Sequence, residues 1–244
     1  MNKKAQVTLF VIIALFLIGI IIAFFLLKDK IFIKSESSSE VADIHSFVKD
    51  CIQSSGDYSI SEISEKGGYF FTPSLSTNEG VPYYFFNNHS YIPSKEKLES
   101  ELSKQIRTSI SLCTNDFEDF KNAEISPSNI SVVSSLNEDS VISEVNYPLS
   151  IKRNNKTFLL NDFGEFEFST NLNKLYGSAN EVVYSFEKEN SFCLSCIKDI
   201  AIKNNVKIDI QNTYNNTLIF IIKDKDSIEN SLLIEFIFAI ENEF

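Results

Sequence analysis

The hydrophobic pattern divides the chain into one long apolar run and a longer region of mixed periods. Residues 7–27 are 21 positions without a charge or a proline. A helix rises about 1.5 Å per residue, so this run matches a hydrocarbon core of roughly 30 Å. A cleaved secretory signal has an apolar core of only about 7–15 residues and then a small-residue cleavage site, which AFFLLKDKIFIK lacks. The run therefore predicts one transmembrane helix.

After residue 34, apolar residues recur at helical spacing in four places. They predict helices over residues 41–52, 94–113, 172–186 and from 193 to about 203. Ser94 and Ser191 stand where N-cap residues are expected. In the second helix, four charged residues are expected on the polar side: Glu99, Glu101, Lys104 and Arg107.

Short apolar or alternating segments between these helices predict strands. They are residues 67–71, 81–86, 90–92, 130–136, 141–152, 156–160, 165–169, 206–211, 217–223 and 232–240, with Asn154 and Asn155 at a hairpin tip. Helices and strands do not alternate strictly, which favours an α+β fold with mostly antiparallel sheet behind the transmembrane helix. We expect a leader and anchor in residues 1–34 and an α+β region in 35–244. Residues 122–128 fit either a domain boundary or a loop within one domain.

The net charge of residues 35–244 limits the classes of molecule that this region can bind. Residues 35–244 contain 17 basic and 32 acidic residues, a net charge of −15. Such a surface repels nucleic acid and anionic headgroups, so we expect no nucleic-acid binding.

Four cysteines, Cys51, Cys113, Cys193 and Cys196, carry the main chemical signal. An even number outside the membrane fits two disulfides, while four free thiols in a cytosolic domain remain the alternative. Four cysteines permit three pairings. The close pair Cys193–Cys196 leaves Cys51 with Cys113, and both of these are expected at helix C-termini.

The CLSC segment has two interpretations. A cysteine in the first turn of a helix has a lowered thiol pKa, which a redox-active dithiol requires. However, no buried strand leads directly into CLSC, and no proline follows Pro148. We therefore favour a structural local disulfide over a thiol–disulfide oxidoreductase. The remaining candidates, His45 and His89, lack the spacing of a metal site, and we expect neither a metal nor a cofactor.

Two further sets of residues bear on the surface. The aromatic strings at 69–71 and 83–86 fit core strands better than an exposed partner surface. Four N-x-S/T sequons in predicted turns or loops favour an external domain: Asn88, Asn129, Asn155 and Asn215.

The run Lys3-Lys4-Ala5-Gln6-Val7-Thr8-Leu9-Phe10 resembles the class III signal of archaeal type IV pilin-like proteins. The resemblance implies cleavage between Ala5 and Gln6, with the hydrophobic helix kept on the mature protein. Assembling pilins usually carry glutamate at the fifth mature position, where this chain has Phe10. The rest of the chain resembles an uncharacterised group of archaeal single-pass proteins with a GGY after a short helix and a late CLSC. Together these features imply a pilin-like anchor rather than a main filament subunit.

Lysines flank the apolar run on both sides, so the charge rule leaves its orientation nearly balanced. The class III resemblance favours the C-terminal domain outside the cell. We expect a single-pass membrane protein that contacts the bilayer through residues 7–27 and other surface proteins through its domain. Its expected role is structural or interaction-based, without enzymatic activity. The alternative is a membrane-tethered oxidoreductase that uses Cys193 and Cys196.

Overall fold

The computed structural model describes residues 37–153, 156–189, 192–213, 216–225 and 233–241. The chain forms two compact units, residues 1–46 and 47–244. The predicted anchor at 7–27 and the cleavage site at Ala5 and Gln6 lie outside the described residues. Within the described ranges, no helix combines the length and the apolar character that crossing a membrane would need.

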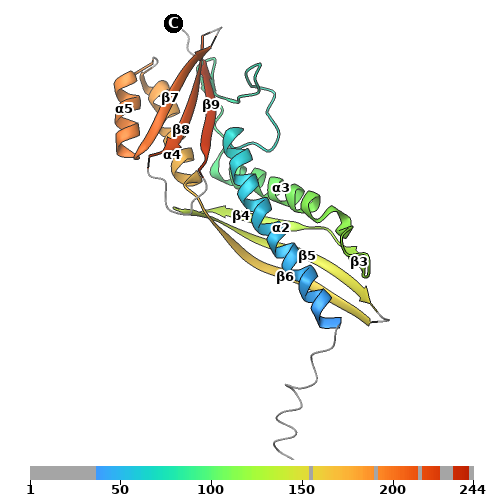
Figure 1. The fold of residues 1–244 in the computed structure, drawn as a ribbon. Coiled ribbons are helices and arrows are strands. Elements are labelled where there is room, and N and C mark those ends of the chain that lie inside the picture. Colours follow the sequence, from blue (N-terminus) through green and yellow to red (C-terminus); the bar gives the residue numbers. More distant parts are fainter. Residues whose placement is uncertain (1–36, 154–155, 190–191, 214–215, 226–232, 242–244) are drawn as a thin grey trace, which may run out of the picture. The chain divides into compact units, whose positions relative to one another are not determined.

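The predicted α+β class is confirmed (Figure 1). The described residues form four α-helices: α2 (Ser37–Glu65), α3 (Lys95–Thr114), α4 (Leu172–Glu189) and α5 (Leu194–Lys203), with a 3-10 turn, η1 (Asn115–Phe117). They also form nine strands: β1 (Tyr83–Phe86), β2 (His89–Ser90), β3 (Glu124–Pro127), β4 (Ser131–Leu136), β5 (Ser140–Arg153), β6 (Lys156–Ser169), β7 (Val206–Thr213), β8 (Thr217–Asp224) and β9 (Glu235–Glu241).

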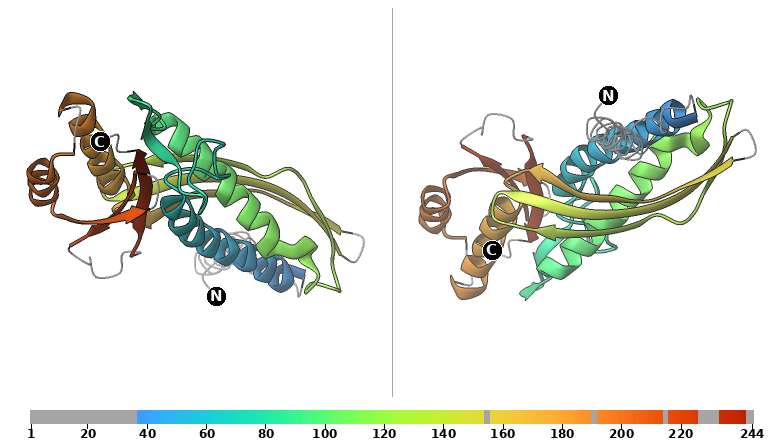
Figure 2. Two further views of the ribbon diagram at one scale, coloured as in Figure 1. Left: turned by 90° about the horizontal axis from the view of Figure 1, so that it is seen from above. Right: turned by 90° about the horizontal axis from the view of Figure 1, so that it is seen from below.

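One sheet has the order β2-β1-β9-β8-β7, in which only β1 and β9 pair in parallel. α4 lies against β8 and β9, and α5 lies against β7 (Figure 2). Rings from β1, β8, β9 and α4 meet on one face of this sheet, where Tyr84 of β1 stacks on Phe238 of β9 at 4.8 Å between centroids. Phe220 stacks on Phe238 at 5.3 Å between centroids, and Phe186 meets Phe220 edge-on at 5.9 Å. Such aromatic pairs add to the free energy gained from burial.

The second sheet is built around β5. β4 pairs with the first half of β5 and β3 with the second half, while β6 pairs along nearly the whole strand on the opposite edge. Side chains of β5 alternate in exposure from Val141 to Ile151, and the odd-numbered ones are buried. α3 packs against β4. This alternation is the pattern of a sheet with one covered face.

β6 corrects the expectation of two separate strands at 156–160 and 165–169. It is one strand of 14 residues, interrupted by a bulge where Gly164 has a φ of +84°. Glycine adopts this left-handed backbone without strain, so Gly164 permits the irregularity within the strand. β3 lies within residues 122–128 and was also missed, because EISP is too short to show alternation.

α2 is longer than the predicted 41–52. Residues 53–65 contain several serines and Gly56, which favour other structures over helix. Ile60 and Ile63 continue the buried stripe, and both are at most 1% exposed. Packing of this stripe outweighs the weak intrinsic propensity.

Gly56 marks a close approach between α2 and β6. A Cβ atom built on Gly56 would overlap the ring of Phe168 on β6. Phe168 is 1% exposed, so its ring has little room to move. Gly177 in α4 has the same conformation, but no atom lies within 4 Å of its Cβ position.

The predicted strand at 67–71 is wrong. Gly67 and Gly68 have positive φ values of 57° and 82° and end α2. The Gly68 N–H donates to the Ile63 carbonyl at 2.7 Å, as in a helix C-cap. Phe71 is 75% exposed, so this aromatic string is not core, whereas Tyr84 and Phe85 in the second string are buried as predicted.

Two buried tyrosines fix the segments that flank the first sheet. The Tyr84 hydroxyl donates to the Gly67 carbonyl at 2.8 Å, and the Tyr176 hydroxyl donates to the Pro93 carbonyl at 2.7 Å. Burial, with nearby tyrosines as a smaller cause, raises the pKa of Tyr84 well above its ordinary value. The neutral hydroxyl therefore remains a hydrogen-bond donor.

The α2–β6 contact can be tested with a matched pair of substitutions. Gly56→Ala should destabilise the full chain by about 2 kcal/mol, because overpacking a rigid core costs roughly 1–3 kcal/mol. Gly177→Ala should stabilise it by about 0.5–1 kcal/mol, because alanine favours an unobstructed helix interior. Thermal unfolding in detergent measures both, and equal effects in the two variants would contradict the close contact.

Candidate functional site

The first disulfide joins α2 to α3. Cys51 and Cys113 are bonded, with their Cα atoms 5.7 Å apart and 62 positions apart in sequence. Cys51 is 2% exposed, whereas Cys113 lies at the surface. The pairing expected from elimination is confirmed. Only Cys113 is near a helix C-terminus, because α2 continues 14 residues past Cys51.

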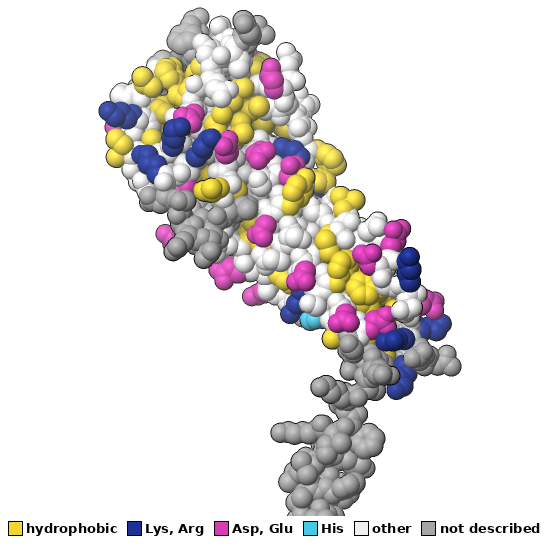
Figure 3. Space-filling model, in the orientation of Figure 1, with side chains coloured by type: hydrophobic (Ala, Val, Ile, Leu, Met, Phe, Trp, Pro, Cys, Tyr) yellow, Lys and Arg dark blue, Asp and Glu magenta, His cyan; other side chains and the backbone are white. Residues whose placement is uncertain are grey.

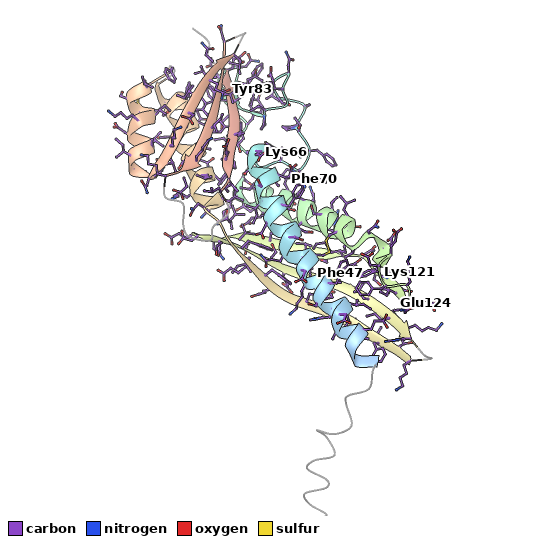
Figure 4. The ribbon with its side chains drawn as sticks, viewed as in Figure 1. Phe47, Lys66, Phe70, Tyr83, Lys121 and Glu124 are labelled. Atoms are coloured by element: carbon purple, nitrogen blue, oxygen red, sulfur yellow. A yellow bond between two sulfur atoms is a disulfide. The ribbon has the colours of Figure 1, made fainter. Side chains whose placement is uncertain are left out.

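The two helices run antiparallel next to this bond. The Ser59 hydroxyl donates to the Ser109 hydroxyl at 3.3 Å, further along α2 and earlier along α3 than the cysteines. Closing a loop of this length in the unfolded chain contributes about 4 kcal/mol to stability on the chain-entropy estimate. Phe47 lies on α2 (Figure 4). Its ring meets the rings of Phe117 and Phe120, which follow α3, edge-on at 6.3 Å and 5.3 Å between centroids.

The second disulfide, Cys193–Cys196, lies at the start of α5. Ser191, the predicted N-cap, lies outside the described residues, and Cys193 is itself the N-cap. The Cys196 N–H donates to Cys193 Sγ at 3.2 Å, and the Ser195 hydroxyl lies 3.4 Å from the same sulfur. A loop this short restricts the unfolded chain little and contributes only about 2 kcal/mol on the same estimate.

A cavity of about 450 Å³ opens between α4 and α5 beside Cys196. Tyr184 on its wall is 65% exposed, and Leu194, between the two cysteines, is also 65% exposed. The other lining residues are mostly charged or polar: Glu181, Ser185, Lys188, Asp199, Ile200 and Lys203. Cys196 therefore borders a hollow whose wall carries the exposed Tyr184 ring.

A larger hollow, about 590 Å³, lies between the C-terminal half of α3 and the residues before β4. Arg107 lines it, together with Asp116 and Asn129, and Arg107 also lines two smaller neighbouring hollows. Sequence reasoning placed Arg107 only on a polar helix face. Its neighbours in this hollow come from residues 127–130, which no local pattern brings next to α3.

Glu101 corrects the expected polar face of α3, because it is 6% exposed. Its carboxylate accepts from Lys104 and Lys97, both at 2.8 Å, and from the Phe70 N–H at 3.1 Å. Burial alone would raise the pKa of Glu101. The hydrogen bonds and the Lys97 charge lower the pKa by more than burial raises it, so that it falls from 4.5 to about 2. The carboxylate thus holds the segment after α2 against α3.

Two of the four glycosylation candidates lie within the described residues, and two lie outside them. Asn88 and Asn129 are exposed, the first in the tight turn between β1 and β2. Asn155 and Asn215 lie outside the described residues. Exposure meets the steric requirement for an acceptor at the first two sites.

Histidine, cysteine and carboxylate side chains do not gather in threes in a way that could hold a metal ion in the part of the chain that the structure describes. In comparisons with known proteins, no family model, curated protein or solved structure matched this chain.

Glu101 gives a prediction with a defined pH dependence. The folded pKa lies below the ordinary value of 4.5, so the carboxylate contributes stability above pH 4.5 that is lost as pH falls toward 2. Glu101→Gln should lower the free energy of unfolding at pH 7 by about 1–3 kcal/mol. The difference from the unmodified chain should shrink between pH 4.5 and pH 2.

Denaturant titrations across this pH range measure the effect, with Glu79→Gln as the control at an exposed carboxylate. A Glu101→Gln deficit that stays constant with pH would contradict the assignment.

Proposed function

We propose that this chain is a single-pass membrane protein that displays its disulfide-bonded α+β domain outside the cell. Residues 7–27 anchor it in the bilayer, and Gln6 becomes the mature N-terminus after cleavage behind Ala5. The domain has a structural or interaction role in a pilin-like surface assembly or envelope complex. It contacts other membrane or surface proteins and no nucleic acid.

The observation that carries the external location is the state of the cysteines. All four are paired, and no free thiol remains. Disulfides persist in oxidising compartments and are rare where glutathione and thioredoxin keep thiols reduced. Cys51–Cys113 joins two helices, and the Cys51 side chain is only 2% exposed.

The charged surface supports the same proposal. On the face in Figure 3, acidic side chains are spread widely, and the basic ones are interspersed with them rather than forming one continuous surface. The net charge of the whole chain is −11. A phosphate backbone would be repelled by such a surface.

The long β6 strand supports an interaction role. One edge pairs with β5, and no described strand pairs with the other edge. Lys156, Thr157 and Leu159 on this strand are exposed, Leu159 by 68%. Unpaired edges of this length are sites at which another chain can add a strand.

Surface labelling of intact cells that produce the full chain tests the location. A membrane-impermeant amine reagent should modify Lys97, Lys152 and Lys203 without permeabilisation, because their side chains are 51%, 56% and 68% exposed. Peptide mass spectrometry identifies the modified lysines, and an abundant cytosolic protein serves as the unlabelled control. Labelling that requires permeabilisation would overturn the proposed orientation.

A further inference from the structure

We propose that the Cys193–Cys196 disulfide is redox-active and exchanges with a dithiol of a polypeptide substrate, with Cys193 forming the mixed disulfide. This proposal reverses the preference for a purely structural local disulfide that the sequence alone indicated, because the structure places two donors at Cys193 Sγ. It goes beyond the anchoring role and does not depend on the side of the membrane. It rests on the N-terminal end of α5 and on the surface around it.

The hydrogen bonds at the disulfide distinguish the two sulfurs. Cys193 Sγ accepts the Cys196 N–H at 3.2 Å and has the Ser195 hydroxyl at 3.4 Å. No hydrogen bond to Cys196 Sγ is present among the described residues. Donors at a helix N-terminus stabilise a thiolate, so the reduced pair carries its negative charge on Cys193.

The surroundings fit a polypeptide rather than a small thiol. Leu194 is 65% exposed between the cysteines, and Tyr184 is 65% exposed on the wall of the 450 Å³ hollow that Cys196 also lines. These two side chains are the apolar contacts that we expect an extended polypeptide to make next to Cys193 and Cys196. Lys203 and Asp199 on the same wall supply polar contacts.

The two disulfides also differ in how much of the chain each one restrains. Cys51–Cys113 spans 62 positions and joins two helices, whereas Cys193–Cys196 spans 3 positions within one helical start. Opening the local bond frees almost no additional chain. The local bond therefore contributes less to stability than Cys51–Cys113, and we expect the fold to persist in both oxidation states at α5.

The exchange balances in two steps. A substrate thiolate attacks Cys193 Sγ, the Cys193–Cys196 bond breaks, and Cys196 leaves as a thiolate that takes up a proton. The second substrate thiolate then attacks the substrate sulfur of the mixed disulfide, and Cys193 leaves as the stabilised thiolate. The substrate loses two electrons and becomes a disulfide, while the pair gains two electrons and becomes a dithiol.

The test uses the full chain in detergent, first equilibrated with defined glutathione buffers and then alkylated for mass spectrometry. The Cys193–Cys196 pair should open at glutathione ratios that leave Cys51–Cys113 intact. Simultaneous opening of both bonds, or opening of Cys51–Cys113 first, would overturn the proposal.

Single variants then separate the two sulfurs. With oxidised glutathione at pH 6, Cys193 in the Cys196→Ser variant should form its mixed disulfide at least about 10-fold faster than Cys196 in Cys193→Ser. Thiolate absorbance should give Cys193 a pKa below about 8.5, the ordinary cysteine value. Equal rates or the reverse order would contradict the assignment.

The Ser195→Ala variant keeps both cysteines, so its redox behaviour can be measured in a chain that still forms both disulfides. Losing this hydroxyl should raise the pKa of reduced Cys193 and make the pair harder to reduce, while the unfolding temperature stays unchanged. An unchanged pKa and an unchanged glutathione equilibrium in this variant would show that the Ser195 hydroxyl does not stabilise the thiolate, contrary to the proposed geometry.

Discussion

The close packing of α2 on the second sheet is the constraint on which the larger unit depends. Gly56 brings the helix down onto Phe168, and Cys51 binds it to α3 five positions earlier. α3 in turn covers β4 on the opposite edge of β5 from β6. The Cys51–Cys113 disulfide and the absence of a Cβ atom at Gly56 thus allow α2 and α3 to pack over one face of the sheet.

Side-chain hydrogen bonds hold the segment between α2 and α3 in place, next to the sheet that contains β1 and β9. Tyr84 in β1 bonds to the turn that ends α2, and Tyr176 in α4 bonds to the residue before the N-cap of α3. Glu101 adds a charged acceptor for the Phe70 N–H from within α3. Each bond joins elements far apart in sequence, and leaving any buried partner unpaired would cost about 1–3 kcal/mol.

Much of this arrangement could be predicted because it has a local signal. The apolar face from Leu172 to Phe186 and the Ser94 cap identified α4 and α3 within a few residues. The Cys51–Cys113 bond could be expected once the local pair was set aside.

Other features depend on distant contacts. Residues 53–65 are helical because Ile60 and Ile63 are buried, and Glu101 is buried because Phe70 and two lysines meet its carboxylate. The hollow beside Arg107 needs residues 127–130 to lie next to α3, and the sequence carries no sign of that approach.

The apolar run at residues 7–27 precedes a domain whose four cysteines are all oxidised. We propose that this domain matures outside the cell on a processed anchor. The most direct measurement is the intact mass of the protein extracted from its own membranes without reductant. The account predicts a chain that lacks Met1–Ala5 and is about 4 Da lighter than its reduced form, because each of two disulfides removes two hydrogens. Discrete glycan increments would add to that mass. A full-length chain with four free thiols and no glycan would contradict it.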